Sequence, residues 1–188
     1  MATKFEKLED KHRDFIARQH IFFTASAAPD TRVNISPRPT NALRILGPNT
    51  VAYLDQTGSG NETAAHIKAD GRMTIMFCAF EGPPMILRLH GKGHNHFRGS
   101  PEYARLLDAH FDGTEFPGAR QIVVLEADLV VSSCGYGVPF FDYKRDRPGL
   151  DNWASQKSEE ELVAYRRQKN RASLDGLPTG SPEEEPAV

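Results

Sequence analysis

The feature that most limits how this 188-residue chain can fold is a series of short apolar segments separated by turn-forming residues. Several of them alternate polar and apolar residues, and Pro, Gly, Asn or Asp stands between neighbours. Helical periodicity is confined to short stretches, which disfavours a doubly wound parallel sheet. We therefore expect a mainly β fold, a β-barrel of about six antiparallel strands with flanking helices. The strand-like segments are residues 20–27, 32–36, 43–46, 50–54, 73–80, 85–91 and 121–132.

The chain divides into four parts by composition. Residues 1–19 predict an N-terminal helix, and residues 20–134 hold the barrel. Residues 135–174 begin with an aromatic, glycine-rich segment and continue into a helix that we expect to pack on the barrel. Residues 175–188 are rich in Pro, Gly and Glu and predict a disordered tail. Further short helices are expected at residues 61–69, 100–111 and 158–172, the last two with a serine at the N-cap position.

Charge and cysteine content narrow the class of protein. The formal net charge is -2, so no basic field indicates nucleic-acid binding. The N-terminus lacks an apolar signal core, and no apolar run is long enough to cross a bilayer. Cys78 and Cys134 lie far apart, and Cys78 stands in an apolar segment. These features predict a cytoplasmic protein that binds no membrane and has no disulfide framework.

The segment from Val51 to Ile67 predicts a strand, a glycine-containing turn and a short helix. This arrangement suits a phosphate, because the first N–H groups of a helix lack partners and carry the positive end of its dipole. Ser59, Asn61 and Thr63 add side-chain donors, but no lysine follows in the pattern of a nucleotide triphosphatase loop. The same residues also fit a capping box, in which Ser59 caps the helix and Glu62 reaches back.

Four segments in one order resemble a known family. They are residues 32–38 (RVNISPR), 53–63 (YLDQTGSGNET), 73–77 (MTIMF) and 87–93 (LRLHGKG). Together they are similar to the pyridoxamine 5'-phosphate oxidase-like family, in an uncharacterised branch, over residues 21–131. The resemblance implies an FMN-binding split β-barrel, a homodimer with two FMN sites at the subunit interface, and oxidoreductase activity on a small-molecule substrate or electron donor.

The resemblance also implies which residues bind the cofactor. The strand that passes the flavin ring contributes Arg32, Val33, Asn34 and Ser36, and Arg88 lies on the strand that faces the partner's flavin. The residues that the resemblance implies for binding the ribityl chain and phosphate are Asp55, Gln56, Ser59, Asn61 and Thr63. The family's turn usually carries an Arg–Lys pair, whereas this chain has Glu62 and Thr63 near that position. The negative charge of the phosphate would therefore be balanced by Arg32, Arg88 or Lys68. No catalytic residue is assigned, because the flavin itself would carry the chemistry.

Other groups have two interpretations each. His90, His94 and His96 suit a metal by residue type, but we favour an exposed loop, without a metal site, because no cysteine or carboxylate stands at ligand spacing. Trp153 and the aromatics between Tyr136 and Tyr143 would either stack on a flat ligand or pin the C-terminal segment. Cys134 could be a reactive thiol, but it lacks a neighbouring base, which favours a structural or incidental role.

A second functional hypothesis is a non-catalytic protein of the same fold that stores or senses flavin, haem or a deazaflavin. In such a protein the aromatics of residues 135–141 would seal the pocket beside the ring.

Overall fold

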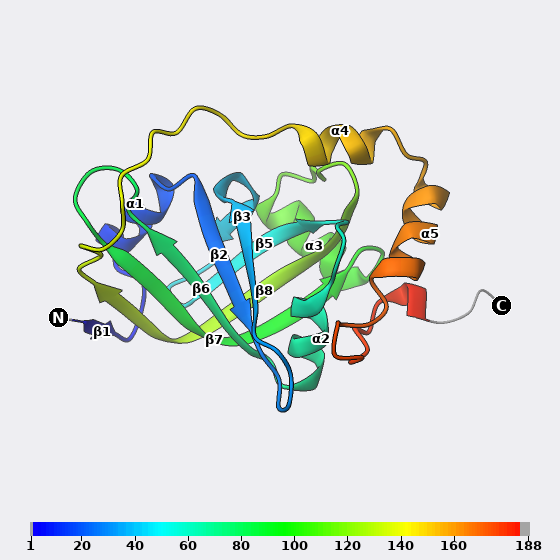
Figure 1. The fold of residues 1–188 in the computed structure, drawn as a ribbon, viewed down its shortest axis with the longest axis horizontal. Coiled ribbons are helices and arrows are strands. Elements are labelled where there is room, and N and C mark those ends of the chain that lie inside the picture. The colour runs from blue at the N-terminus through cyan, green and yellow to red at the C-terminus, as the bar shows by residue number, and fades with distance from the viewer. Residues whose placement is uncertain (1, 185–188) are drawn as a thin grey trace.

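The computed structural model describes residues 2–184, and its centre is one strongly curled antiparallel sheet (Figure 1). Seven strands follow the order β3-β2-β6-β7-β8-β5-β4, and β1 pairs with the end of β8. The strands are β1 Thr3–Phe5, β2 Ile21–Ser26, β3 Asn34–Pro39, β4 Leu43–Ile45, β5 Thr50–Gln56, β6 Arg72–Cys78, β7 Ile86–Phe97 and β8 Ala119–Ser133.

The expected barrel of six strands is corrected in two respects. The sheet holds seven strands on its main path, and β3 and β4 stand at opposite ends of that path, so the curl is a half-barrel with two edges. The short β1 was expected to be helical. It forms because β5 covers only residues 119–126 of the long β8, which leaves Val130, Val131 and Ser132 free to pair with Thr3–Phe5.

Helices make the fold mixed α/β rather than mainly β. The described residues contain five α-helices: α1 Asp10–Ala17, α2 Glu62–Ala69, α3 Pro101–His110, α4 Gly149–Ser155 and α5 Glu159–Lys169. Short 3-10 turns occur at Thr40–Ala42 and Pro182–Glu184. The two expected serine caps are confirmed, because Ser100 accepts from the Tyr103 N–H and Ser158 forms a capping box with Glu161.

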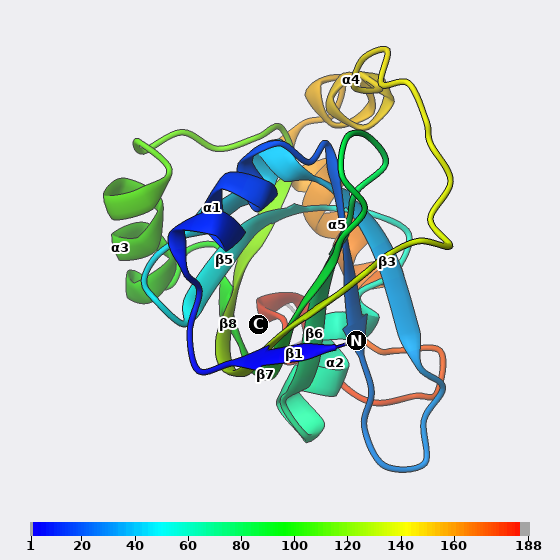
Figure 2. The same cartoon turned by 90° about the vertical axis from the view of Figure 1, so that its left-hand side faces the viewer.

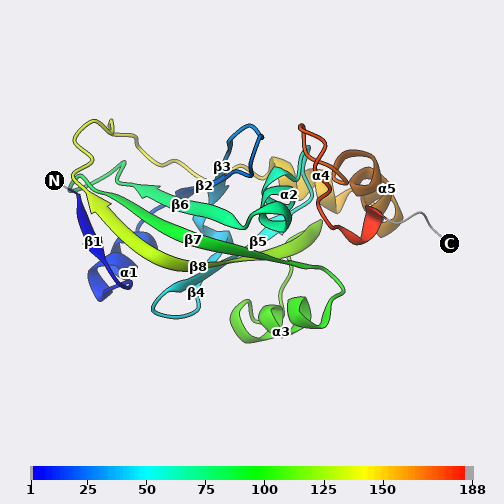
Figure 3. The same ribbon diagram turned by 90° about the horizontal axis from the view of Figure 1, so that it is seen from below.

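Two apolar clusters lie on the two sides of the sheet. The larger fills the curl and includes Phe22, Tyr53, Phe77 and Leu89, closed by Phe15 of α1. The smaller lies between α3 and the other face of β5 and β8, around Leu54, Leu106, Ile122 and Val124. Figure 3 shows α2 and α3 on opposite sides of β7 and β8. Burial on both faces explains why the middle of β8 is nearly continuously apolar.

Gly91 allows β7 and β8 to bend together. The register of the two strands shifts between His90 and Gly91, which marks a β-bulge. A Cβ atom on Gly91 would lie 1.9 Å from the Glu126 carbonyl oxygen, so only glycine fits. The extra residue of the bulge is Asp128 of β8, because His90 pairs with Leu129 and Gly91 pairs with Ala127. The facing strand β7 contains His90, His94 and His96, so these histidines lie within a strand and not in the loop that we expected.

The C-terminal part of the chain returns to the opposite end of the sheet. Residues 134–148 run as an extended segment across the molecule and join β8 to α4 (Figures 1 and 2). We call residues 149–184 the C-terminal arm. The expected disorder of residues 175–188 is wrong for residues 175–184, because Thr179 and Ser181 are buried and Glu183 pairs with Arg166. Residues 185–188 lie outside the described residues.

None of the helices within residues 2–184 has the length and apolar character that crossing a membrane requires.

Candidate functional site

A cavity of about 550 Å³ opens where β5 ends and α2 begins. We call it the turn cavity. Its walls come from β3, from the turn of residues 57–61, from the first turn of α2 and from the C-terminal arm. The sequence-predicted residues that it brings together are Asn34, Ser36, Gln56, Ser59, Asn61 and Thr63. Segments distant in the chain thus present hydroxyl and amide groups to one space.

The helix behind the turn starts later than a Ser59 capping box requires. The N-cap residue of α2 is Asn61, and its side chain makes no capping hydrogen bond. Ser59 is exposed at the cavity instead, so the capping-box interpretation is wrong. The Asn61 Oδ1 atom accepts from Gln121 Nε2 at 2.9 Å, and Asn34 Nδ2 donates to Thr63 Oγ1 at 3.1 Å. The turn is therefore held from beneath by β8 and from the side by β3.

Asp55 lies beneath the cavity and does not line it. Its carboxylate is fully buried and pairs with Arg38 and Arg120, and Gln121 Nε2 donates to it at 2.6 Å. Burial raises the pKa of Asp55, but the two guanidinium groups and the Gln121 hydrogen bond outweigh it, so the pKa lies below its usual range. Asp55 is thus an ionised anchor for the groups around the turn.

Arg38 and Arg120 are lining residues of the turn cavity that the sequence prediction missed. Arg38 follows Asn34 and Ser36 at the alternating positions of β3, and that period-2 pattern is the signal that would have found it. Its Nε atom is buried and has no acceptor among the described residues. Arg120 stands at the start of β8, directly before the Gln121 that pairs in register with Asp55.

The C-terminal arm closes one side of the cavity through contacts with the turn. Asn170 Nδ2 donates to the Gly58 carbonyl oxygen at 2.9 Å, while Asn170 Oδ1 accepts from Arg120 at 2.9 Å. The Leu174 N–H donates to the Glu62 carboxylate at 3.1 Å. Cavity-lining residues from the arm are Leu150, Lys169, Ala172, Ser173 and Leu174.

Four predicted site residues do not behave as lining residues of this cavity: Asp55, as described, and Arg32, Val33 and Arg88. The Arg32 side chain is 78% exposed and pairs with Asp175 of the arm. Val33 is 67% exposed and borders another cavity, of about 380 Å³, with Ser26, Thr74 and His90. Arg88 lies on β7 and donates to Ser133 Oγ at 3.3 Å. Within one chain, these side chains and the turn therefore form separate groups.

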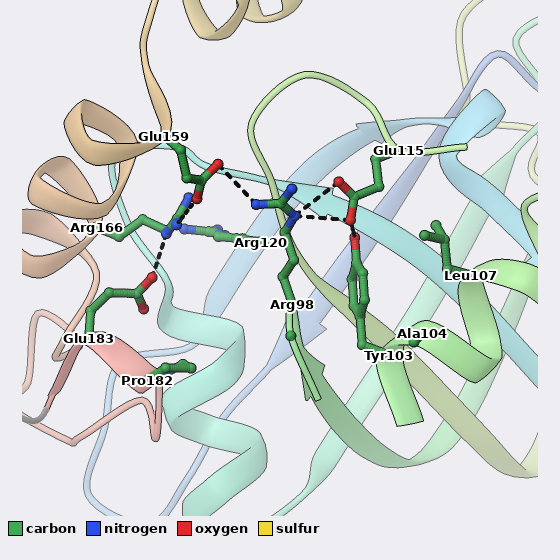
Figure 4. Close-up of a pocket in the computed structure, with 11 residues that line it drawn as sticks. Arg98, Tyr103, Ala104, Leu107, Glu115, Arg120, Glu159, Arg166, Pro182 and Glu183 are labelled. Atoms are coloured by element: carbon green, nitrogen blue, oxygen red, sulfur yellow. Dashed lines mark hydrogen bonds and ion pairs between the residues drawn. The ribbon is translucent and has the colours of Figure 1, made fainter. Parts of the chain in front are cut away.

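A second cavity, of about 410 Å³, adjoins the first through Arg120 (Figure 4). Arg98 lies between Glu115 and Glu159, and Arg166 lies between Glu159 and Glu183. The Tyr103 hydroxyl donates to Glu115 at 2.7 Å; burial, together with this hydrogen bond, raises its pKa. These alternating charges fasten α5 and the 182–184 turn to α3 and the end of β7.

The remaining candidates lie outside the turn cavity. Trp153 packs edge-to-face on Tyr165 with ring centroids 5.1 Å apart, so it joins α4 to α5 within the arm. Tyr136, Phe140 and Phe141 are exposed on the connecting segment. Both cysteines are free, Cys78 buried and Cys134 exposed. In the part of the chain that the structure describes, no three His, Cys, Asp or Glu side chains gather as a metal ligand set.

Comparison with known proteins places this arrangement in a family. The model of the pyridoxamine 5'-phosphate oxidase family matches residues 8–134, which span the whole sheet from β2 to β8. The chain belongs to the pyridoxamine 5'-phosphate oxidase family. Its relative in Aspergillus flavus, pyridoxamine 5'-phosphate oxidase family protein ustO, is 38% identical over 95% of this chain and 78% of that protein. The expected family membership is therefore confirmed.

Solved structures share the fold of this family member. HupZ from Group A Streptococcus is 17% identical and superimposes with a TM-score of 0.51 over 65% of this chain and 91% of that one. A Lactobacillus delbrueckii protein solved as a candidate pyridoxamine 5'-phosphate oxidase is 19% identical, with a TM-score of 0.52 over 67% of this chain and 94% of that one. At these identities the likeness shows the split-barrel fold alone. The C-terminal arm lies entirely beyond the family match, which ends at residue 134.

Proposed function

We propose that this family member is an FMN-binding oxidoreductase that acts as a homodimer, with a small-molecule substrate or electron donor. The observation that carries the proposal is the turn cavity itself. Ser59 and Thr63 supply hydroxyl groups at the start of α2, where a phosphate is favoured by the helix dipole and free N–H groups, and Ser36 supplies another from β3. FMN is the family's cofactor that carries such a phosphate.

The donor set of the cavity fits a phosphorylated ligand. Arg38 lines the wall and has a buried Nε–H without an acceptor among the described residues, which an anionic oxygen would satisfy. Asn34 and Gln56 add amide groups suited to ribityl hydroxyls. Glu62 opposes an anion, but its carboxylate accepts the Leu174 N–H and is thereby directed to the arm. The residues present therefore suit the phosphate and sugar-like chain of a flavin nucleotide.

The chemistry proposed for the site is flavin chemistry. A bound flavin supplies hydride or electron transfer, and the protein supplies orientation and electrostatics. Arg88, which lies outside the turn cavity of its own chain, would serve the partner's flavin, where a guanidinium favours the negative charge gained on reduction. The backbone of residues 32–36 would lie beside the ring, and no side chain is assigned a catalytic role.

The dimer proposal rests on the open sheet edges. The edge strand β3 carries Ile35, and Val33 precedes it; both apolar side chains are about two-thirds exposed. Unpaired edges with apolar side chains favour association, which removes them from water. Light scattering at micromolar concentration should give twice the 20.9 kDa chain mass. A single chain mass would contradict a shared flavin site.

The absorbance spectrum of the purified protein tests the cofactor, and reduction tests the activity. We expect the two visible bands of an oxidised flavin, and their anaerobic bleaching on addition of NADH or NADPH. A haem Soret band or a deazaflavin spectrum would show instead that the bound ligand is haem or a deazaflavin and not FMN. Bound flavin that neither nucleotide reduces would favour a non-catalytic storage or sensor protein.

A further inference from the structure

The turn contributes no positive charge to the phosphate site. Between Thr57 and Thr63, the only ionisable side chain is that of Glu62, which is acidic. Neutral donors and a helix dipole leave most of the charge of a phosphate dianion uncompensated, whereas a cation adds direct Coulomb attraction. A cation from another segment would therefore bind the phosphate more tightly in the turn cavity.

Three arginines that could supply this cation already have carboxylate partners. Arg38 and Arg120 share the buried carboxylate of Asp55. Arg32, which sequence reasoning favoured, pairs with Asp175 outside the cavity. Removing either guanidinium from Asp55 would leave buried charge without compensation, which opposes their full transfer to a ligand.

Lys169 is the cation in the cavity wall that remains available. It is the last residue of α5, it lines the turn cavity, and within residues 2–184 no carboxylate lies within ion-pair distance of its Nζ atom. Its neighbour Asn170 is 1% exposed and bonds both Gly58 and Arg120. The backbone of Lys169 is thus fastened beside the turn, while its long side chain stays free to reach an anion.

We infer that Lys169 binds the phosphate of the flavin nucleotide and that the C-terminal arm thereby completes the cofactor site. The inference rests on the proposed function. In this chain the phosphate would lie between the hydroxyl groups of the turn on one side and the Lys169 ammonium group on the other. The arm is then part of the binding site, and its contacts with the turn position the cation as well as stabilise the fold.

Equilibrium titration of apoprotein with FMN and with riboflavin, which lacks the phosphate, tests this inference. Lys169→Gln should weaken FMN by about tenfold or more, as loss of a hydrogen bond to a charged group does, and leave riboflavin unchanged. Lys169→Arg should restore most of the FMN affinity. Arg167→Ala is the matched control, because Arg167 is exposed on the same helix and does not line the cavity. It should bind both flavins as the wild type does.

The outcomes separate this inference from the proposed function. If the wild type prefers FMN and Lys169→Gln keeps that preference, Lys169 is not the phosphate's cation although the function stands. If Lys169→Gln weakens FMN and riboflavin alike, the residue only holds the arm in place, and the inference is overturned. If the wild type binds neither flavin, the proposed function itself fails, and the inference falls with it.

Discussion

Arg38 on β3 and Asp55 on β5 form an ion pair that joins one edge strand of the curled sheet to the strand next to the other edge. The same guanidinium lies over the Tyr53 ring, 4.8 Å from its centroid, and Arg120 pairs with the other oxygen of the carboxylate. The half-barrel is therefore closed by side chains where no backbone ladder closes it. The turn cavity lies directly above this closure, so the fold and the candidate site depend on the same charges.

Replacing Asp55 by asparagine should strongly destabilise the fold. Asparagine keeps the shape but leaves the guanidinium groups of Arg38 and Arg120 without their buried partner, which costs about 3–5 kcal/mol of unfolding free energy. Urea denaturation monitored by circular dichroism measures the change. Glu126→Gln is the control, because the Glu126 carboxylate is exposed. The urea midpoint of this variant should stay near that of the wild type. Equal midpoints for the two variants would refute the closure.

The same carboxylate should govern part of the acid denaturation. Because the pKa of Asp55 is lowered in the folded protein, the unfolded state binds more protons in the window between the two pKa values. The stabilisation is fully present above about pH 4–5, near the ordinary aspartate pKa, and is lost as the pH falls through the lower folded value. Stability measured against pH should therefore fall less steeply below about pH 4 in Asp55→Asn. Parallel acid limbs would show that Asp55 is not ionised in the native state.

Removing residues 175–188 should lower the melting temperature. The truncation deletes the Asp175–Arg32 and Glu183–Arg166 pairs and the buried Thr179, whose backbone N–H donates to the Arg171 carbonyl oxygen at 3.0 Å. For a chain of this length each kcal/mol corresponds to about 2–4 °C. Differential scanning fluorimetry against Arg167→Ala as a control measures the effect. An unchanged melting temperature would restore the composition-based expectation that this segment packs nowhere.

Local patterns predicted most of the elements, and the errors have identifiable causes. Two kinds of signal depend on only a few neighbouring residues and could therefore be predicted from the sequence. They are the polar–apolar alternation in β3 and β7 and the serine caps at Ser100 and Ser158. Only the end of the arm, residues 175–184, differs from the prediction. A composition rich in Pro, Gly and Glu indicates that little apolar area can be buried, but Thr179 and Glu183 are held by polar contacts. Strand β1 was also not predicted, because it forms only where β8 extends beyond the end of its pairing with β5.

The sequence predicted the part of the candidate site that lies in the turn, and the family resemblance added Asn34 and Ser36 of β3. Ser59, Asn61 and Thr63 could be grouped because they share the turn. Arg120 and Lys169 join them only through the pairing of β5 with β8 and through the docking of the arm, neither of which has a short-range signal. Arg32 lies outside the turn cavity, where it pairs with Asp175, 143 residues later in the chain.

The central claim is that the turn cavity binds the phosphate of FMN, and the hydroxyl groups of the turn test it most directly. Ser59→Ala combined with Thr63→Val removes two hydroxyls without changing the charge. Fluorescence-quenching titrations should show FMN weakened by about tenfold or more and riboflavin nearly unaffected. If the double variant keeps the full FMN affinity of the wild type, the phosphate is bound elsewhere and the assignment of the site is wrong.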